Sequence, residues 1–142
     1  DSSEAMTGTA REKYGDDLEL MVADARRLPF PNRSFDVVLL ATSIEFIKDA
    51  ESAAAEAERV ARSELLFLML NPDHPMNTMR MRRAESDGGV FRGARFRRPD
   101  ELMKLFGGNG RRRWTGSLVI EPDSSPYYIL KMIRENEDRQ KA

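Results

Sequence analysis

Two short apolar runs separated by a helical segment constrain this chain more than any other feature. Residues 35–41 read FDVVLLA and residues 64–70 read ELLFLML, and runs of this length rich in Val, Leu and Phe are typical of strands buried on both faces. Residues 49–62 between them predict a helix, with Asp49 as a candidate N-cap. This helix has a narrow apolar stripe: Ala53, Ala57 and Val60. Strands alternating with helices predict a parallel α/β sheet.

The segment before this unit predicts a helix, a strand and a loop. Residues 2–15 favour a helix capped by Ser2 or Ser3 and stopped by the glycine at its end. Residues 18–23, LELMVA, predict a short apolar strand. The loop that follows, residues 25–34, contains two prolines, which disfavour regular strand pairing.

The second half predicts two helices and a closing hairpin. Helices are expected at 75–85 and 98–106, and an antiparallel strand pair at 112–121 and 125–133, joined by the turn PDSS. We expect one α/β domain over residues 1–142, with 73–110 as a substrate-side insertion or lid. A flexible polar tail is expected at 134–142.

Composition excludes several kinds of site. The chain has no cysteine, so it forms neither a disulfide nor a thiolate metal site, and we expect a cytoplasmic protein without a bound metal. It contains no apolar run long enough to span a membrane and no signal-peptide pattern, so we expect no membrane partner.

Charge is distributed unevenly along the chain. Residues 1–79 hold 8 basic and 15 acidic side chains, whereas residues 80–113 hold 11 basic and 4 acidic ones. Such asymmetry can mark a surface for an anionic partner. A solvated basic face that only balances the acidic half explains it equally well, and both interpretations remain open.

Several motifs together resemble one family. The stretch DSSEAM at the start of the chain, followed by VADARRLPFPNRSFDVVLLATSIEFIKD at residues 22–49, resembles class I S-adenosylmethionine (SAM)-dependent methyltransferases that act on small molecules. The match is close over residues 1–62 and looser at 70–72 and 91–102. The resemblance implies a Rossmann-like, three-layer fold and SAM as the cofactor.

The resemblance also implies roles for individual residues. Asp1 would accept hydrogen bonds from the ribose hydroxyls, and Asp24 with the backbone of Ala25 would bind the adenine edge. The other implied cofactor contacts are Ser2, Met6, Leu28 and Thr42. Asp24 could instead cap the turn that follows it, and Phe30 is as well explained by packing as by a place over the adenine.

Methyl transfer from a sulfonium needs alignment, a dry site and sometimes a general base, but no metal. His74 follows the 64–70 strand at the carboxyl end of the sheet, where open α/β folds bind ligands. It is the candidate base, although an exposed histidine without a catalytic role is the commoner case. Thr42, Ser43 and Glu45 are expected to face the same crevice.

The resembled family begins with a strand and a glycine-rich turn before the ribose-binding acid, and these 142 residues contain neither. That fold has the strand order 3-2-1-4-5-7-6. Without its two central strands, 18–23 should be separated from 35–41, which becomes an exposed apolar edge. We therefore expect either a piece of a longer methyltransferase or a chain that pairs this edge with another chain.

Three functions follow as hypotheses. The first is SAM-dependent methyl transfer to a small, possibly anionic molecule. The second is a non-catalytic module of the truncated fold that self-associates through its open edge. The third, an RNA methyltransferase using the arginine-rich segment, lacks support from any stacking aromatic cluster, so nucleic acid is not an expected partner.

Overall fold

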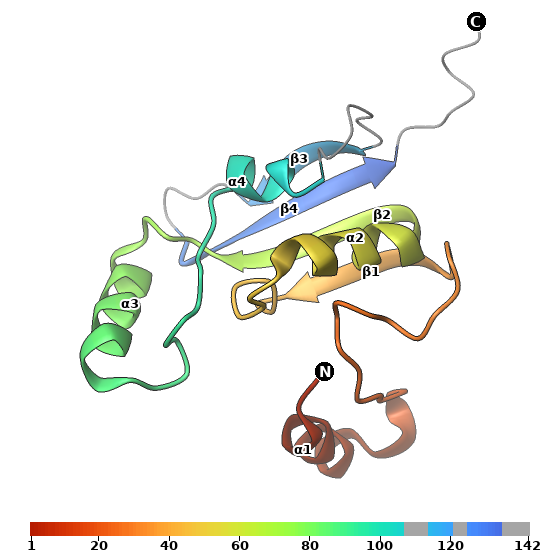
Figure 1. Ribbon diagram of the computed structural model, residues 1–142, viewed down its shortest axis with the longest axis horizontal. Coiled ribbons are helices and arrows are strands. Elements are labelled where there is room, and N and C mark those ends of the chain that lie inside the picture. The colour runs from red at the N-terminus through yellow and green to blue at the C-terminus, as the bar shows by residue number, and fades with distance from the viewer. Residues whose placement is uncertain (107–113, 121–124, 135–142) are drawn as a thin grey trace, which may run out of the picture.

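A computed structural model describes residues 1–106, 114–120 and 125–134 of the chain. The described residues form one four-stranded sheet with the order β1-β2-β4-β3 (Figure 1). Its strands are β1 (Phe35–Ala41), β2 (Ala61–Leu70), β3 (Trp114–Ile120) and β4 (Tyr127–Arg134). β1 and β2 are parallel, whereas β4 is antiparallel to both β2 and β3. The predicted parallel unit and antiparallel closing pair are both confirmed.

The helices begin and end where local chemistry places their caps. They are α1 (Glu4–Tyr14), α2 (Ala50–Val60), α3 (Pro75–Asp87) and α4 (Pro99–Lys104), with a 3-10 turn η1 (Gly15–Asp17) after α1. Ser3 caps α1, and Asp49 caps α2 by accepting from the backbone N–H of Ser52 at 3.0 Å. Gly15 ends α1 with a positive φ of 58°. These caps agree with the prediction.

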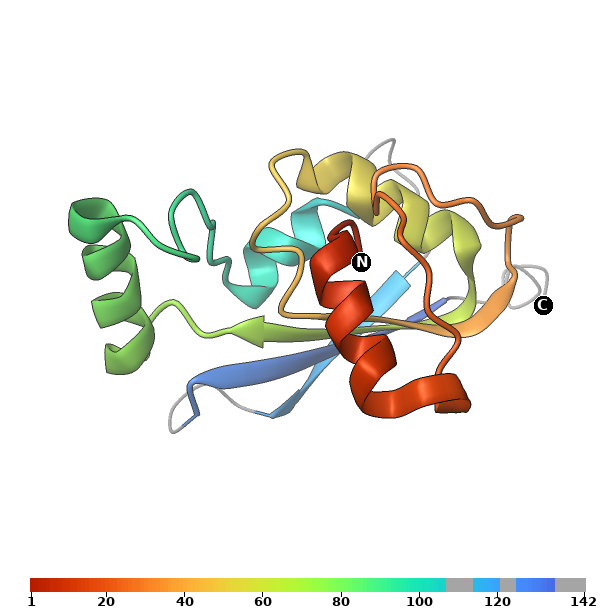
Figure 2. The ribbon, with the colours of Figure 1, turned by 90° about the horizontal axis from the view of Figure 1, so that it is seen from below.

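The core lies on one face of the sheet. Helices α2 and α4 both lie on this side (Figure 2). The alanine stripe of α2 and Leu102 of α4 pack against alternate residues of β2 and β4, which are buried: Leu65, Phe67, Met69, Tyr128, Leu130 and Met132. Alternation is the expected result when only one face of a strand is covered.

The predicted strand at 18–23 is wrong, because these residues belong to neither a helix nor a sheet ladder. Their backbone hydrogen bonds are with Asp1: its amino group donates to the Met21 carbonyl at 3.2 Å, and its carbonyl accepts from Ala23 N–H at 2.9 Å. This is the pattern of a single parallel bridge. One bridge does not make a strand, because a ladder needs several successive pairs.

The bridge and α1 lie beyond the β1 edge of the sheet (Figures 1 and 2). β1 therefore pairs with β2 on one side, and no described residue pairs with its other side. The prediction that both faces of β1 are buried is wrong: Phe35, Val37 and Leu39 are 40%, 46% and 58% exposed. The predicted separation of 18–23 from 35–41 and the exposed apolar edge are confirmed.

The other elements differ from the prediction only at their ends. β2 starts at Ala61 rather than at residue 64, because its ladder with β1 already begins opposite Phe35. α3 runs two residues further than expected, to Asp87, and ends at Gly88 with φ 77°. The residues at 107–113, 121–124 and 135–142 lie outside the described structure, and so do most of the PDSS turn and the predicted tail.

Candidate functional site

Two chain segments meet around Asp1 and Asp24. The bridge that holds Asp1 beside Met21 and Ala23 brings these two acids to neighbouring positions. The Asp1 carboxylate accepts from Ser3 N–H at 2.8 Å, which orients the start of α1. Ser2, the next residue in the chain, is exposed, and so is Met6 in the first turn of α1. The structure therefore places Asp1, which Ser2 follows in the chain, beside the residues that lead directly into Asp24 and Ala25.

The Asp24 carboxylate is held by Arg26. Its oxygens accept from Arg26 Nε at 3.0 Å and from Nη2 at 2.7 Å, and also from the Arg26 backbone N–H at 2.9 Å. The hydrogen bonds from the Arg26 side chain and backbone lower the pKa of Asp24 to about 2. The Asp24 carbonyl accepts from Arg27 N–H at 3.0 Å. Asp24 thus caps its turn, the alternative that the sequence left open, and its ionised carboxylate stays exposed.

The turn at 24–27 is tied to the carboxyl end of β1. Arg26 interacts electrostatically with Asp49, the cap of α2, and Ala25 packs against the main core. At the same end of β1, Thr42 has a φ of 43°, a left-handed conformation that costs a β-branched residue of the order of 1–3 kcal/mol. Its backbone N–H donates to the Leu68 carbonyl at 2.8 Å. Strained backbone of this kind gathers at functional sites, so it supports the expected role of Thr42.

The loop that would cover the adenine is fixed by two residues that the sequence analysis did not identify. Arg59 donates to the carbonyls of Phe30 and Leu28 at 2.7 and 3.0 Å. It also pairs with Glu56 at 2.7 Å, and Glu56 in turn accepts from Leu28 N–H at 2.7 Å. Both side chains lie on the polar side of α2, where an i,i+3 pair of opposite charge was the available sequence signal.

A buried carboxyl, Glu45, lies just past β1. Only 1% of Glu45 is exposed, and burial raises the pKa of its carboxyl. One carboxyl oxygen accepts from Leu70 N–H at 2.8 Å, whereas the other is buried without a hydrogen-bond partner. Its backbone carbonyl accepts from Arg95 N–H at 2.7 Å. Glu45 therefore joins the ends of β1 and β2 to the basic segment and is buried instead of facing an open crevice.

The buried residue Arg97 fastens the same segment to the sheet. Its guanidinium donates to the Ile44 carbonyl at 3.2 Å, and its own carbonyl accepts a hydrogen bond from the buried Tyr128 hydroxyl. Burial lowers the pKa of Arg97 and raises that of Tyr128. Ser43, the remaining residue expected at the crevice, is half-buried.

His74 caps α3. Its Nδ1 accepts from Met76 N–H at 3.3 Å, which in the neutral imidazole assigns the ring proton to Nε2. In this tautomer Nε2 can donate but not accept, so a base role would require the cap to break. The catalytic role of His74 stays a prediction. The neighbouring Asp73 pairs with Arg98 across the start of α4.

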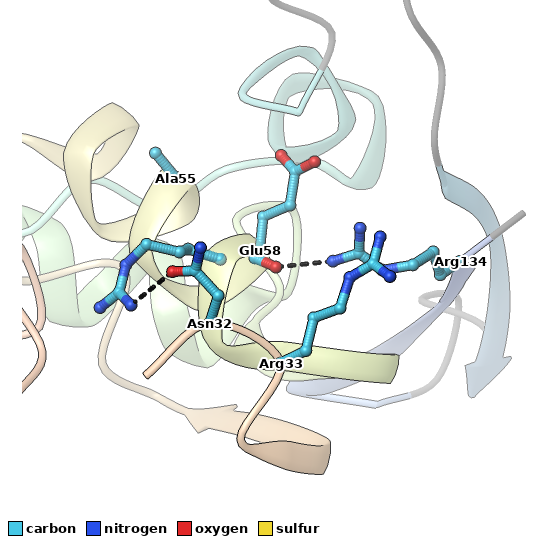
Figure 3. Close-up of a pocket in the computed structure, with 6 residues that line it drawn as sticks. Asn32, Arg33, Ala55, Glu58 and Arg134 are labelled. Carbon is cyan, nitrogen blue, oxygen red and sulfur yellow. Dashed lines mark hydrogen bonds between the residues drawn. The ribbon is translucent and has the colours of Figure 1, made fainter. Parts of the chain in front are cut away.

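A hollow of about 360 Å³ lies at the other end of the sheet. Figure 3 shows its lining, which comes from the loop before β1, from α2 and from the last residue of the antiparallel strand β4: Asn32, Arg33, Ala55, Glu58, Arg59 and Arg134. Arg134 donates to the carbonyls of Glu58 and Ala61 at 2.7 and 3.0 Å, which satisfies the last turn of α2. Ligands of open α/β sheets bind at the carboxyl ends of strands, so this hollow is not part of the candidate site.

Two other features are absent from the described residues. These residues contain no group of three or more His, Asp or Glu side chains placed to hold a metal ion. None of their helices combines the length and the apolar character needed to cross a membrane.

The strand order, the parallel β1-α2-β2 unit and the antiparallel closing strands define a Rossmann-like methyltransferase fold. Solved structures agree. A SAM-dependent methyltransferase from Thermotoga maritima, titled as a possible histamine N-methyltransferase, is 20% identical with a TM-score of 0.74, covering 95% of this chain and 72% of that one. Magnesium protoporphyrin IX methyltransferase from Synechocystis, with bound S-adenosylhomocysteine (SAH), has a TM-score of 0.66 at 18% identity over 95% and 62% of the two chains.

Sequence comparison finds similarity to methyltransferases mainly in the first half of the chain. Residues 1–69 match the family model described as a methyltransferase domain, so this part of the chain is similar to class I SAM-dependent methyltransferases, which agrees with the resemblance of its motifs. A ubiquinone/menaquinone biosynthesis C-methyltransferase from Hahella chejuensis is 39% identical over 64 residues, 45% of this chain and 26% of that protein. A chloroplastic 2-methyl-6-phytyl-1,4-hydroquinone methyltransferase from rice is 38% identical over 76 residues, 53% and 22% of the two. The chain thus spans about a quarter of the length of these relatives.

Proposed function

We propose that this chain supplies the adenosine-binding and acceptor-facing parts of a SAM-dependent methyltransferase for small molecules. The observation that carries the proposal is the pairing of Asp1 with residues 21–23, which brings Asp1 and Asp24 together within the segment that matches the methyltransferase domain. Two carboxylates at neighbouring positions fit the donors of adenosine, namely its ribose hydroxyls and exocyclic amine.

The cofactor would supply a methyl group on a positively charged sulfur, and the protein would bind and align it. In the proposal Asp1 accepts from the ribose hydroxyls, while Asp24 accepts from the adenine amine after yielding part of its contact with the exposed Arg26. Leu28 and Phe30 lie on a loop already fixed by Arg59, so they need little ordering to cover the base. Thr42 would lie near the end of the cofactor that carries the methyl group.

The finer proposal concerns the acceptor. One relative is named as a C-methyltransferase of ubiquinone/menaquinone biosynthesis and another as a hydroquinone methyltransferase, and we take a hydroquinone as the acceptor class. Arg95, exposed and joined by its backbone to Glu45 at the carboxyl end of the sheet, would favour the anionic form of such a ring. An ionised hydroxyl donates electron density to the ring carbon that receives the methyl group.

Photolabelling with methyl-labelled SAM tests the cofactor site, and a panel of hydroquinones tests the acceptor. We expect labelling that SAH competes away and that Asp24→Ala reduces at least tenfold, about 1.4 kcal/mol. Labelling that SAH does not compete away, or that Asp24→Ala does not reduce, would overturn the proposal. Arg95→Glu should lower methyl transfer to hydroquinones while leaving the labelling unchanged; equal transfer by both proteins would remove Arg95 and the anionic acceptor from the proposal.

The exposed edge of β1 supports a second candidate, a non-catalytic module that self-associates. An unpaired strand with Phe35, Val37 and Leu39 exposed is a template for pairing with a second copy. Sedimentation should then show a concentration-dependent dimer that Val37→Lys disrupts. A monomer at all concentrations, or a dimer unaffected by that substitution, would exclude pairing through this edge.

A further inference from the structure

Helix α3 and residues 88–98 form an arm that extends from the end of the sheet where β1 and β2 finish (Figures 1 and 2). Its base is fixed by Glu45 and Arg97, and its middle by aromatic contacts. Phe91 lies 5.9 Å from Phe46 and 6.0 Å from Phe96 between ring centroids. The arm is therefore held in place, and its outer side chains present a defined surface.

The arm carries seven arginines against two acidic residues, Glu85 and Asp87. Three of the seven are engaged. Arg80 donates to Asn77 and lies 5.5 Å from the Phe91 ring centroid, Arg97 is buried, and Arg98 pairs with Asp73. The other four are exposed and take part in none of the ion pairs among the described residues: Arg82, Arg83, Arg92 and Arg95.

Apolar side chains are exposed among these arginines. Val90 is 81% exposed and follows the end of α3, where Gly88 and Gly89 turn the chain with φ values of 77° and 94°. Met79, 45% exposed, lies three and four positions before Arg82 and Arg83 on α3 and so shares their face. Cations beside exposed aliphatic groups are the composition of protein surfaces that lie on anionic bilayers.

We propose that this arm binds the surface of an anionic lipid bilayer, with Arg82, Arg83 and Arg92 contacting lipid phosphates and Val90 entering the interface. Exposed aliphatic groups are stabilised in the bilayer interface, whereas nucleic-acid binding would use exposed aromatic rings that stack on bases. The arm's Phe91 and Phe96 are packed against each other instead. The sequence predicted no membrane partner because it lacks a spanning segment, but surface binding needs none. The inference does not depend on the proposed reaction.

Vesicle co-sedimentation tests the proposal with the chain as it is. We expect binding to phosphatidylcholine vesicles that contain phosphatidylglycerol, weakened by salt, and little binding to phosphatidylcholine alone. Each arginine near such a surface strengthens binding severalfold, so R82E/R83E should weaken binding at least about tenfold. Val90→Ser, made in the otherwise unmodified chain, should also weaken vesicle binding but should leave its salt dependence unchanged.

The matched control is R11E/R27E, which makes the same change in net charge at exposed arginines outside the arm. This variant should bind vesicles like the unmodified chain. Equal weakening by both double variants, equal binding to both kinds of vesicle, or an arm-dependent preference for single-stranded RNA over vesicles would overturn the proposal. Photolabelling by SAM is expected to be unchanged in R82E/R83E, so failure here and failure of the proposed function are distinguishable.

Discussion

Replacing Arg59 by methionine should loosen the loop that is proposed to cover the adenine. The substitution keeps an unbranched apolar stem over α2 but removes the guanidinium. That group donates to the carbonyls of Leu28 and Phe30, to Asn32 Oδ1 at 3.0 Å, and to both oxygens of Glu56. Arg59 is thus the main side-chain link between residues 28–32 and helix α2.

The expected cost follows from these contacts. A hydrogen bond from a charged donor contributes roughly 1.5–3 kcal/mol when buried, but the Arg59 side chain is 30% exposed and its Glu56 partner 19% exposed. Water can replace part of each contact, so about 1 kcal/mol for each of the three loop contacts is the appropriate scale. We expect Arg59→Met to lower the free energy of unfolding by about 2–3 kcal/mol.

The pH dependence gives an independent check. The hydrogen bond from Arg59 lowers the pKa of Glu56 from its ordinary value of 4.5. A depressed carboxyl pKa stabilises the fold above the unfolded value, and this stability is lost as the pH falls through the folded pKa. Arg59→Met should therefore be less sensitive than the unmodified chain to acidification below about pH 4.5.

Urea unfolding followed by circular dichroism measures both effects, and amide hydrogen exchange at Leu28 reports on the loop itself. Arg62→Met is a suitable control, because its ion pair with Asp36 is exposed and should cost less than about 1 kcal/mol. A change below about 0.5 kcal/mol for Arg59→Met, or faster exchange that is not concentrated in the loop, would refute the reasoning.

Three other substitutions test separate parts of the structure by urea unfolding. Tyr128→Phe removes the buried hydroxyl that donates to the Arg97 carbonyl and should cost about 1–2 kcal/mol; no loss would mean that this contact does not hold the arm. Thr42→Gly relieves a φ of 43° and should stabilise the chain by about 1 kcal/mol while weakening SAM photolabelling; destabilisation would contradict the strain. Burial raises the pKa of the Glu45 carboxyl, so the unmodified chain should lose stability as the pH rises above about 4.5 and the buried group ionises. Glu45→Gln has no ionisable group there, so its stability should not fall over the same pH range; an equal fall in both proteins would contradict this.

The sequence predicted elements whose signals are local. The Asp49 cap, the alanine stripe of α2 and the apolar run of β1 depend on neighbouring residues, and all three are confirmed. Residues 18–23 have the same apolar character as β1 but do not form a strand, because strand formation depends on a partner that no local pattern encodes. The two-sided burial expected of β1 is wrong for the same reason.

The candidate site shows the same division. The resemblance to the methyltransferase family was what led us to expect Asp1 and Asp24 at one place, whereas the choice of Arg26 as a partner for Asp24 depends on side-chain conformation. The burial of Glu45 depends on Arg95 and Arg97, some fifty residues later in the chain, packing across it. The sequence marked Glu45 as a crevice residue because it follows β1, but the fold places it under the arm.

The most direct test of the central claim is a calorimetric titration of the 142-residue chain with SAH, repeated with Asp24→Ala and Arg26→Ala. If Asp1 and Asp24 form an adenosine site, SAH should bind with a stoichiometry of one. Asp24→Ala should lower the affinity at least tenfold, about 1.4 kcal/mol, whereas Arg26→Ala, which frees the same carboxylate, should not weaken it. Absence of binding, or binding that both substitutions leave unchanged, would contradict the account.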